Sequence, residues 1–221
     1  MKFTVFGSTG RTGRLVVSEA LRRGHDVTAF TRRPEALRDD TRRLTTVVPG
    51  DGRDPGAVHT AVSGADAIIA IVSPGRRAGP HQTAAVARVI VDQMNRSGVR
   101  RLIATSAYPL VGDSPRVPMA LLRLIFADSY ADAAAMEHIV SATDLDWTIA
   151  RLNRLTDKPA TGGVRMTSGL FDRPTGLTRA DAAATLLDII ADGTTIRNAV
   201  NVAGPRPRLR TTAPASGTSS S

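Results

Sequence analysis

The sequence predicts an α/β fold, a doubly wound parallel sheet with helices on both faces. Short continuous apolar runs alternate with amphipathic stretches almost from end to end. This pattern is typical of parallel strands buried on both faces and of the helices that cover them, and right-handed crossovers then give an open sheet. A length of 221 residues suits a single domain. We expect this domain over 1–204, with a small substrate-pocket part at about 151–204. A flexible tail rich in Pro, Ser and Thr should follow at 205–221.

The elements can be assigned in order from these patterns. Leu15, Val16, Ala20 and Leu21 share one face at helical spacing, and Gly24 is a natural helix stop. The expected strands are KFTVF (2–6), DVTAF (26–30), LTTVV (44–48), DAIIAIV (66–72), RRLIATS (100–106), DWTIAR (146–151) and NAVNV (198–202). The expected helices are 11–23, 34–38, 54–62, 81–98, 119–142 and 178–193.

Composition excludes several classes of function. The chain has no cysteine, so it offers neither disulfides nor a thiolate nucleophile. The histidines at 25, 59, 81 and 138 show no ligand spacing, so no metal is expected. No run approaches the roughly 18 apolar residues of a membrane span, and a strand pattern follows Met1 directly. We therefore expect a cytoplasmic protein with no membrane partner.

The net charge of +9 does not favour a nucleic-acid surface. Three of the arginines lie in the tail, the others are scattered in pairs, and few aromatic residues are present to stack on bases. Arginine-rich, lysine-poor usage is typical of a GC-rich, bacterial genome. The expected partner is a small-molecule substrate, and the chain should be a monomer or homodimer.

Three glycines stand between the first apolar run and the first amphipathic one, in GSTGRTG. We expect Gly7 to make a tight turn, Gly10 to let the backbone approach a pyrophosphate, and Gly13 to allow close packing of helix on strand. The N–H groups at the helix start would then hold phosphates. The position between strand and helix predicts a dinucleotide site in a Rossmann-like fold, rather than a merely structural turn. The expected cofactor-binding residues of this loop are Gly7, Ser8, Thr9, Gly10, Arg11, Thr12 and Gly13.

The next apolar run ends in Thr31, Arg32 and Arg33, where an acid would bind the ribose 2′-hydroxyl of NAD. A guanidinium binds phosphate through two parallel hydrogen bonds, so Arg32 and Arg33 suit a 2′-phosphate. Arg11 in the glycine loop is a candidate to assist them. The alternative is a solvated basic pair at a helix start, where the helix dipole disfavours cations. The expected cofactor is NADP(H).

Six stretches share a further pattern: GSTGRTG, VTAFTRRP, PGDGRD, GADAIIAIV, LIATSAY and AAMEHIVSATDLDWTIARLNRLTD. On these the chain resembles the atypical short-chain dehydrogenase/reductases, the NAD(P)H-binding group that includes biliverdin reductase B (flavin reductase) and NmrA-like proteins. The likeness covers most of 1–190. It implies that Asp51 and Gly52 contact the adenine, that Val72 and Ser73 flank the cofactor, and that Thr105 and Ser106 lie beside the nicotinamide. Leu152 and Asn153, after the sixth strand, are expected at that end as well.

The Tyr-x-x-x-Lys group familiar from this superfamily is missing. The residues four positions after Tyr108 and Tyr130 are Gly112 and Ala134. Another group must therefore supply the proton, or an acceptor such as a flavin or quinone takes it from water.

Four catalytic candidates lie in loops expected at the carboxyl ends of the strands. Ser106 can donate a hydrogen bond to a carbonyl that gains negative charge, or cap a turn. Tyr108 can line the pocket or simply pack. Arg154 stands where biliverdin reductase B has its active-site histidine, in a gapless reading anchored on DKP, and could stabilise charge. His81 can shuttle a proton or lie on the surface.

The resulting functional prediction is an NADPH-dependent reductase. Its acceptor would be small and conjugated or carbonyl-bearing: a flavin, a quinone or a polyketide-like ketone. Two alternatives stay open: an NmrA-like redox sensor that binds NADP(H) without turnover, and a non-redox isomerase-type catalyst that uses the same pocket.

Overall fold

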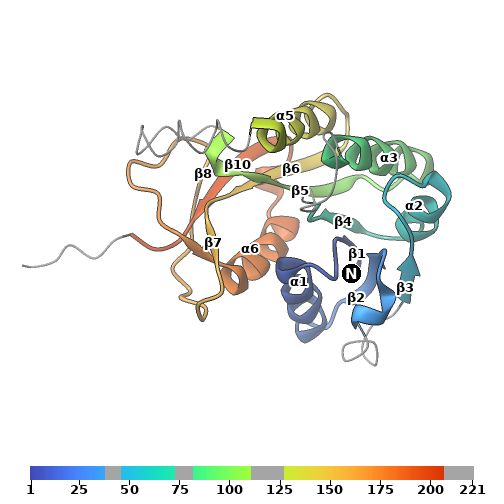
Figure 1. Cartoon of the computed structure of the whole chain (residues 1–221), viewed down its shortest axis with the longest axis horizontal. Helices are drawn as coiled ribbons and strands as arrows, with labels where there is room; N and C mark the ends of the chain where they lie inside the picture. The colour runs from blue at the N-terminus through green and yellow to red at the C-terminus, as the bar shows by residue number, and fades with distance from the viewer. Residues whose placement is uncertain (38–45, 73–81, 111–126, 207–221) are drawn as a thin grey trace, which may run out of the picture.

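The structure, a computed structural model, describes residues 1–37, 46–72, 82–110 and 127–206 (Figure 1). An eight-stranded sheet forms its centre, in the order β3-β2-β1-β4-β5-β6-β10-β8, and a separate pair joins β7 to β9. The strands are β1 (Lys2–Phe6), β2 (Asp26–Thr31), β3 (Thr46–Pro49), β4 (Ala67–Ala70), β5 (Arg101–Ala107), β6 (Asp146–Leu152), β7 (Leu155–Thr156), β8 (Arg165–Thr167), β9 (Leu177–Thr178) and β10 (Asn198–Ala203). The helices are α1 (Arg11–Arg22), α2 (Pro55–Val62), α3 (Gln82–Ser97), α5 (Ala127–Ser141) and α6 (Arg179–Ala191), with 3₁₀ turns η1 (Pro34–Leu37), η2 (Tyr108–Leu110) and η3 (Gly193–Thr195).

Helices cover both faces of the sheet (Figure 1). α1 packs against α6 on one face, while α3 contacts both α2 and α5 on the other. Side chains alternate along each strand, so each face has its own apolar core. On β5, for example, Leu102 and Ala104 belong to the core under α3 and α5, and Ile103 belongs to the core under α1 and α6. The expected Rossmann-like single domain is confirmed.

The pairing within the sheet places a crevice at its centre. β1 pairs in parallel with both β2 and β4, and the chain order runs outward in opposite directions from these two contacts. Ligands of open α/β sheets bind at such a switch point, outside the carboxyl ends of the strands. The carboxyl ends of β1 and β4 are therefore where a site is expected.

The structure adds elements that the periodicity did not indicate. β7, β8 and β9 are two or three residues long, which is too short for a recognisable alternation. β8 pairs antiparallel with β10, at the edge of a sheet that is otherwise parallel. The expected helix over 119–142 is described from Ala127 to Ser141, and the expected strand over 44–48 from Thr46 onward.

Candidate cofactor site

In the turn after β1, the backbone segments approach one another so closely at two glycines that a side chain would not fit. Gly7 has a φ of +76°, and a Cβ added there would lie 2.2 Å from the carbonyl oxygen of Ile71. A Cβ on Gly13 would lie 2.1 Å from the carbonyl oxygen of Gly7, and one on Gly10 would lie 3.1 Å from the same oxygen. The glycines at 7 and 13 thus let β1, α1 and the end of β4 approach one another more closely than any side chain would permit.

The N-terminus of α1 is open to an anion. Gly10 is its N-cap in extended conformation, no described side chain caps the helix, and its first turn holds no acid. Because the first N–H groups of a helix have no partner within it, they can hold phosphate oxygens. Ser8 and Thr9 stabilise the loop: Ser8 Oγ donates to the Phe30 carbonyl at 2.9 Å, and Thr9 Oγ1 lies 3.0 Å from Thr31 Oγ1. Thr12 is buried.

One cleft of about 620 Å³ joins this loop to the ends of β2, β3 and β4. Its lining contains several residues expected from the sequence: Gly7, Thr9, Gly10, Arg32, Arg33, Asp51, Gly52 and Val72. It also contains residues that the sequence reasoning did not single out: Phe6, Phe30, Thr31, Gly50, Ile71, Gln82 and Val86. Most of these additional residues belong to types that are common in the strands and helices of any protein. The sequence alone therefore gives no reason to assign them to a binding site. Gly50 is the exception, since it adjoins Asp51 in PGDGRD.

The far end of the cleft, beside β2 and β3, is rich in guanidinium groups. Arg32 and Arg33 are exposed there, and the backbone N–H of Arg33 donates to Thr31 Oγ1 at 3.0 Å. Asp51 is held by Arg53, whose Nε and Nη2 donate to its two oxygens at 3.0 and 2.8 Å. Mainly through these hydrogen bonds, and with a smaller contribution from Arg32, the pKa of Asp51 is lowered to about 2. The carboxylate is therefore ionised at neutral pH and is engaged by an arginine of its own turn.

Arg11 points elsewhere than the sequence led us to expect. Its guanidinium pairs with the carboxylate of Asp157, in the segment after β7, and Arg179 at the start of α6 binds the same carboxylate at 2.6 Å. Arg11 does not line the cleft that holds Arg32 and Arg33. Its side chain joins the glycine loop to the C-terminal part through the carboxylate of Asp157, and a role for Arg11 at the ribose stays a prediction.

At the carboxyl end of β5 the structure leaves a hydroxyl group without a partner. Ser106 Oγ is buried and has no hydrogen-bond partner among the described residues, whereas Thr105 Oγ1 donates to the Ala70 carbonyl at 3.3 Å. Ser106 pairs in register with Arg151 of β6, and the guanidinium of Arg151 binds Glu137 of α5 through hydrogen bonds of 2.6 to 3.1 Å. A buried hydroxyl without a partner costs free energy, and such groups are often functional.

Tyr108 lies further from solvent than a pocket-lining residue would. It is 2% exposed, its ring packs against Phe171 with centroids 5.5 Å apart, and its hydroxyl oxygen accepts the backbone N–H of Phe171 at 3.0 Å. These contacts fit the packing alternative. A role toward substrate stays a prediction.

The three consecutive candidates at the end of β6 differ in exposure and in contacts. Leu152 is buried, Asn153 donates its side-chain N–H to the Thr175 carbonyl at 2.7 Å, and Arg154 is exposed. Asn153 thus fastens the neighbouring loop, and the amide is occupied by this contact. Ser73 and His81 lie outside the described residues.

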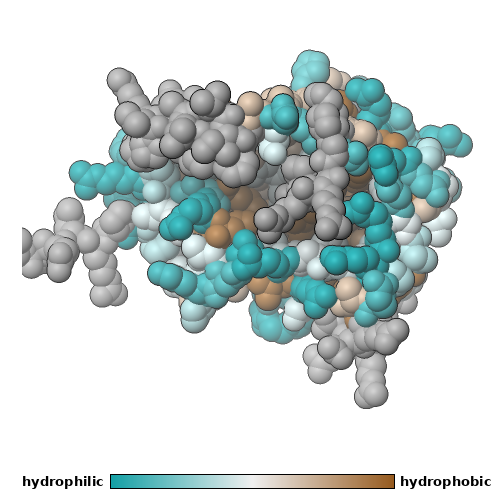
Figure 2. Space-filling view, in the orientation of Figure 1, coloured by the Kyte–Doolittle hydropathy of each residue, from teal (hydrophilic) through white to brown (hydrophobic). Residues whose placement is uncertain are grey.

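Two features of other classes of protein are absent from the part of the chain that the structure describes. There, no group of His, Asp or Glu side chains converges as metal ligands would. No helix of that part has the length and apolarity needed to cross a bilayer. Hydrophilic side chains dominate the face seen in Figure 2, with hydrophobic ones showing in a central area.

Comparisons with known proteins agree with this geometry. The sequence model of an NAD(P)H-binding family matches residues 7–193. The UPF0659 protein C216.03 of Schizosaccharomyces pombe is 27% identical over 221 aligned residues, covering 90% of this chain and 88% of that protein.

Solved structures share the fold at low sequence identity. A short-chain dehydrogenase/reductase from Veillonella parvula, in complex with NADP, superposes with a TM-score of 0.75 at 22% identity, covering 94% of this chain and 99% of that one. ChuY, an anaerobillin reductase from Escherichia coli O157:H7, gives a TM-score of 0.77 at 21% identity, covering 95% and 100%.

Proposed function

Because the chain belongs to the NAD(P)H-binding family, we propose that it is an NADPH-dependent reductase for a small conjugated or carbonyl acceptor, such as a flavin, a quinone or a polyketide-like ketone. The observation that carries the proposal is the single cleft that connects the open N-terminus of α1 with Arg32 and Arg33. The similar proteins from Veillonella parvula, bound to NADP, and from Escherichia coli, an anaerobillin reductase, support the same assignment.

The residues present fit a dinucleotide. The N–H groups of α1 suit its pyrophosphate, and a Cβ on Gly7 or Gly13 would obstruct the turn that presents them. Asp51 and Gly52 line the cleft, and we assign the adenine to their end of it. When bound, NADPH supplies a hydride.

The preference for the 2′-phosphate follows from the charges at the end of β2. NAD-binding proteins place an acid there to accept hydrogen bonds from the ribose. Here β2 ends in Thr31 and is followed by Arg32 and Arg33, and the acid lining the cleft at this end, Asp51, is bound by Arg53. Guanidinium groups at this position attract a phosphate dianion and offer it paired N–H donors.

Ser106 is the residue that we assign to the acceptor. Its buried hydroxyl can donate to a carbonyl oxygen and so stabilise the negative charge that develops on it during reduction. Arg151 is held by Glu137, and this ion pair supports the neighbouring strand without offering an acidic proton. The proton required at the end of the reaction is taken from water, as flavins and quinones permit.

The test is a titration of the purified protein with NADPH and NADH, followed by oxidation at 340 nm with flavin, quinone and ketone acceptors. The double variant Arg32→Ala/Arg33→Ala should weaken NADPH binding about 20- to 100-fold and NADH binding less than about twofold, since it removes charge-assisted bonds to one phosphate. Arg96→Ala, an exposed arginine near the end of α3, is the matched control.

The outcomes separate the parts of the proposal. Equal loss of NADPH and NADH affinity in the double variant would refute the 2′-phosphate role. Tight NADPH binding without oxidation by any acceptor would refute the reductase and favour the redox sensor. Product formation without net NADPH consumption would identify a non-redox catalyst.

A further inference from the structure

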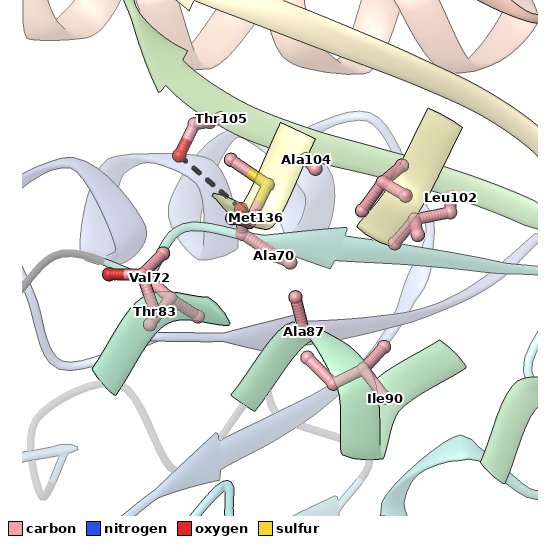
Figure 3. Close-up of a pocket in the computed structure, with 10 residues that line it drawn as sticks. Ala70, Val72, Thr83, Ala87, Ile90, Leu102, Ala104, Thr105 and Met136 are labelled. Carbon is pink, nitrogen blue, oxygen red and sulfur yellow. Dashed lines mark hydrogen bonds between the residues drawn. The ribbon is translucent and has the colours of Figure 1, made fainter. Parts of the chain in front are cut away.

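A second, small cavity lies between the sheet and helices α3 and α5 (Figure 3). Its volume is about 10 Å³, which is close to what one water molecule or one methyl group requires. Ala70, Ala87 and Ala104 give it room, and Leu102 and Met136 are among the larger side chains around it. The cavity is thus a place where β4, β5, α3 and α5 meet at small side chains and leave a gap.

The position of this cavity relates it to the proposed reaction site. Val72, at the carboxyl end of β4, lines both the cavity and the cofactor cleft, so the two adjoin. Figure 3 shows Val72, Thr83 and Thr105 at one end of the cavity, and Leu102 and Ile90 at the other. The cavity therefore extends inward from the carboxyl ends of β4 and β5.

The chemistry of the lining favours an apolar occupant. A water molecule in a cavity needs two to four polar partners. Thr105 Oγ1 is already engaged with the Ala70 carbonyl. Thr83 Oγ1 is buried without a hydrogen-bond partner among the described residues, and this one hydroxyl is fewer than the two to four partners that a water needs. Thr83 is held in place from the other side, because Asp132, a 1% exposed carboxylate of α5, accepts its backbone N–H at 2.8 Å.

Ser106 lies on the same face of β5 as the cavity. Leu102 and Ala104 point toward α3 and α5, and alternation along the strand directs Ser106 to that face as well. Ala104 and Ser106 are two residues apart, or about 6.6 Å along the strand. A carbonyl oxygen hydrogen-bonded to Ser106 at about 2.8 Å, with a methyl group on the adjacent carbon in contact with Ala104 at about 3.8 Å, fits this spacing.

We propose that this cavity is the subsite for a methyl-sized apolar group on the carbon next to the carbonyl of the acceptor. The inference rests on the proposed function and narrows its substrate class to acceptors such as quinones that carry a methyl group on the ring carbon next to a carbonyl. Ser106 would bind the carbonyl oxygen, and the alanines of the cavity would exclude anything much larger than methyl at the neighbouring carbon. Ala104 and Ala87 are then residues that determine specificity.

The test compares two acceptors that differ by one methyl group, 1,4-naphthoquinone and 2-methyl-1,4-naphthoquinone. The quantity measured is the ratio of their kcat/KM values, compared between wild type and variants, so that the intrinsic reactivity of each quinone cancels. Ala104→Val fills the cavity from β5, and Ala87→Val fills it from α3. Each should lower the ratio at least about fourfold, the effect of losing one buried methyl group. The matched control is Ala199→Val on β10, outside the cavity.

Calorimetric titration of the protein–NADP⁺ complex with both quinones gives a readout that does not depend on turnover. A preference for the methylated quinone in binding, lost in both filling variants, supports the subsite even if neither quinone is reduced, and in that case only the reductase proposal fails. Reduction of both quinones with an unchanged ratio in Ala104→Val and Ala87→Val overturns the subsite and leaves the reductase standing. Absence of both binding and reduction overturns the subsite as well.

Discussion

Replacing Gly13 by alanine tests the geometry of the glycine loop directly. The added Cβ would lie 2.1 Å from the carbonyl oxygen of Gly7 and 2.8 Å from its carbon, both of which are backbone atoms. Restoring an ordinary contact requires α1 to withdraw from the turn by about 1 Å. Alanine favours a helix over glycine by about 0.5–1 kcal/mol, whereas such overpacking costs about 1–3 kcal/mol. We expect a net destabilisation of about 1–2 kcal/mol, or a fall in Tm of roughly 2–8 °C.

Cofactor affinity should fall together with stability. The same movement displaces the N–H groups of α1 that we assign to the pyrophosphate, and the loss of one charge-assisted contact of about 1.4 kcal/mol corresponds to a tenfold rise in the Kd of NADPH. Fluorescence titration gives the Kd, and a thermal melt of the protein alone gives the Tm. Gly193→Ala is the control, since a Cβ there meets nothing within 4 Å. Gly10→Ala, at 3.1 Å from Gly7 oxygen, should fall between the two. Wild-type affinity in Gly13→Ala would show that α1 does not hold the phosphates.

Three further changes address the acceptor, the pH dependence and the C-terminal part. Ser106→Ala should lower kcat about 10- to 100-fold while NADPH affinity, measured by the same titration, stays nearly constant; an unchanged rate would make this serine structural. Hydrogen bonds from Arg22 and, to a smaller extent, Arg23 lower the pKa of Glu19 from 4.5 to about 2. The ionised form of Glu19 therefore stabilises the fold fully above about pH 4.5 and loses this effect as the pH falls toward 2. In urea unfolding, the difference in free energy of unfolding between wild type and Glu19→Gln should close over the same pH range. A difference that persists at about pH 2 would contradict the ion-pair account. Asp181→Asn should cost about 2 kcal/mol in the same urea assay, because the buried carboxylate accepts several hydrogen bonds from residues 161–162, and an unchanged midpoint would show that those bonds contribute little.

The sheet and the cofactor loop were predictable because local signals specify them. Continuous apolar runs indicate buried parallel strands, and the right-handed crossover rule leaves few topologies. In GSTGRTG the glycines mark positions where a Cβ has no room, which the structure shows at Gly7 and Gly13. The basic pair at Arg32 and Arg33 follows β2 directly, so its place in the cleft is a consequence of strand direction alone.

The C-terminal part was less predictable because long-range contacts hold it together. The pair β7–β9 has two residues in each strand, and its position depends on Asp181 binding Thr161 and Gly162, twenty positions away. No periodicity records such contacts. Likewise, the burial of Tyr108 depends on Phe171, which lies 63 residues further along the chain. The small cavity beside Ala104 follows from the packing of two helices against two strands, and residue types alone do not determine how completely such a junction is filled.

The position of Arg11 bears on which arginines are candidates for binding the 2′-phosphate of the cofactor. Arginines in a glycine loop and at the end of the second strand look alike in a sequence, and either set could serve a phosphate. The structure separates them: Arg11 shares Asp157 with Arg179, whereas Arg32 and Arg33 line the cleft. The pair between Arg11 and Asp157 joins exposed side chains, so it contributes little to stability. What matters here is that the Arg11 guanidinium lies beside Asp157 and outside the lining of the cleft. Our proposal therefore assigns the discrimination between NADPH and NADH to Arg32 and Arg33, and the double variant tests this assignment while leaving the glycine loop unchanged.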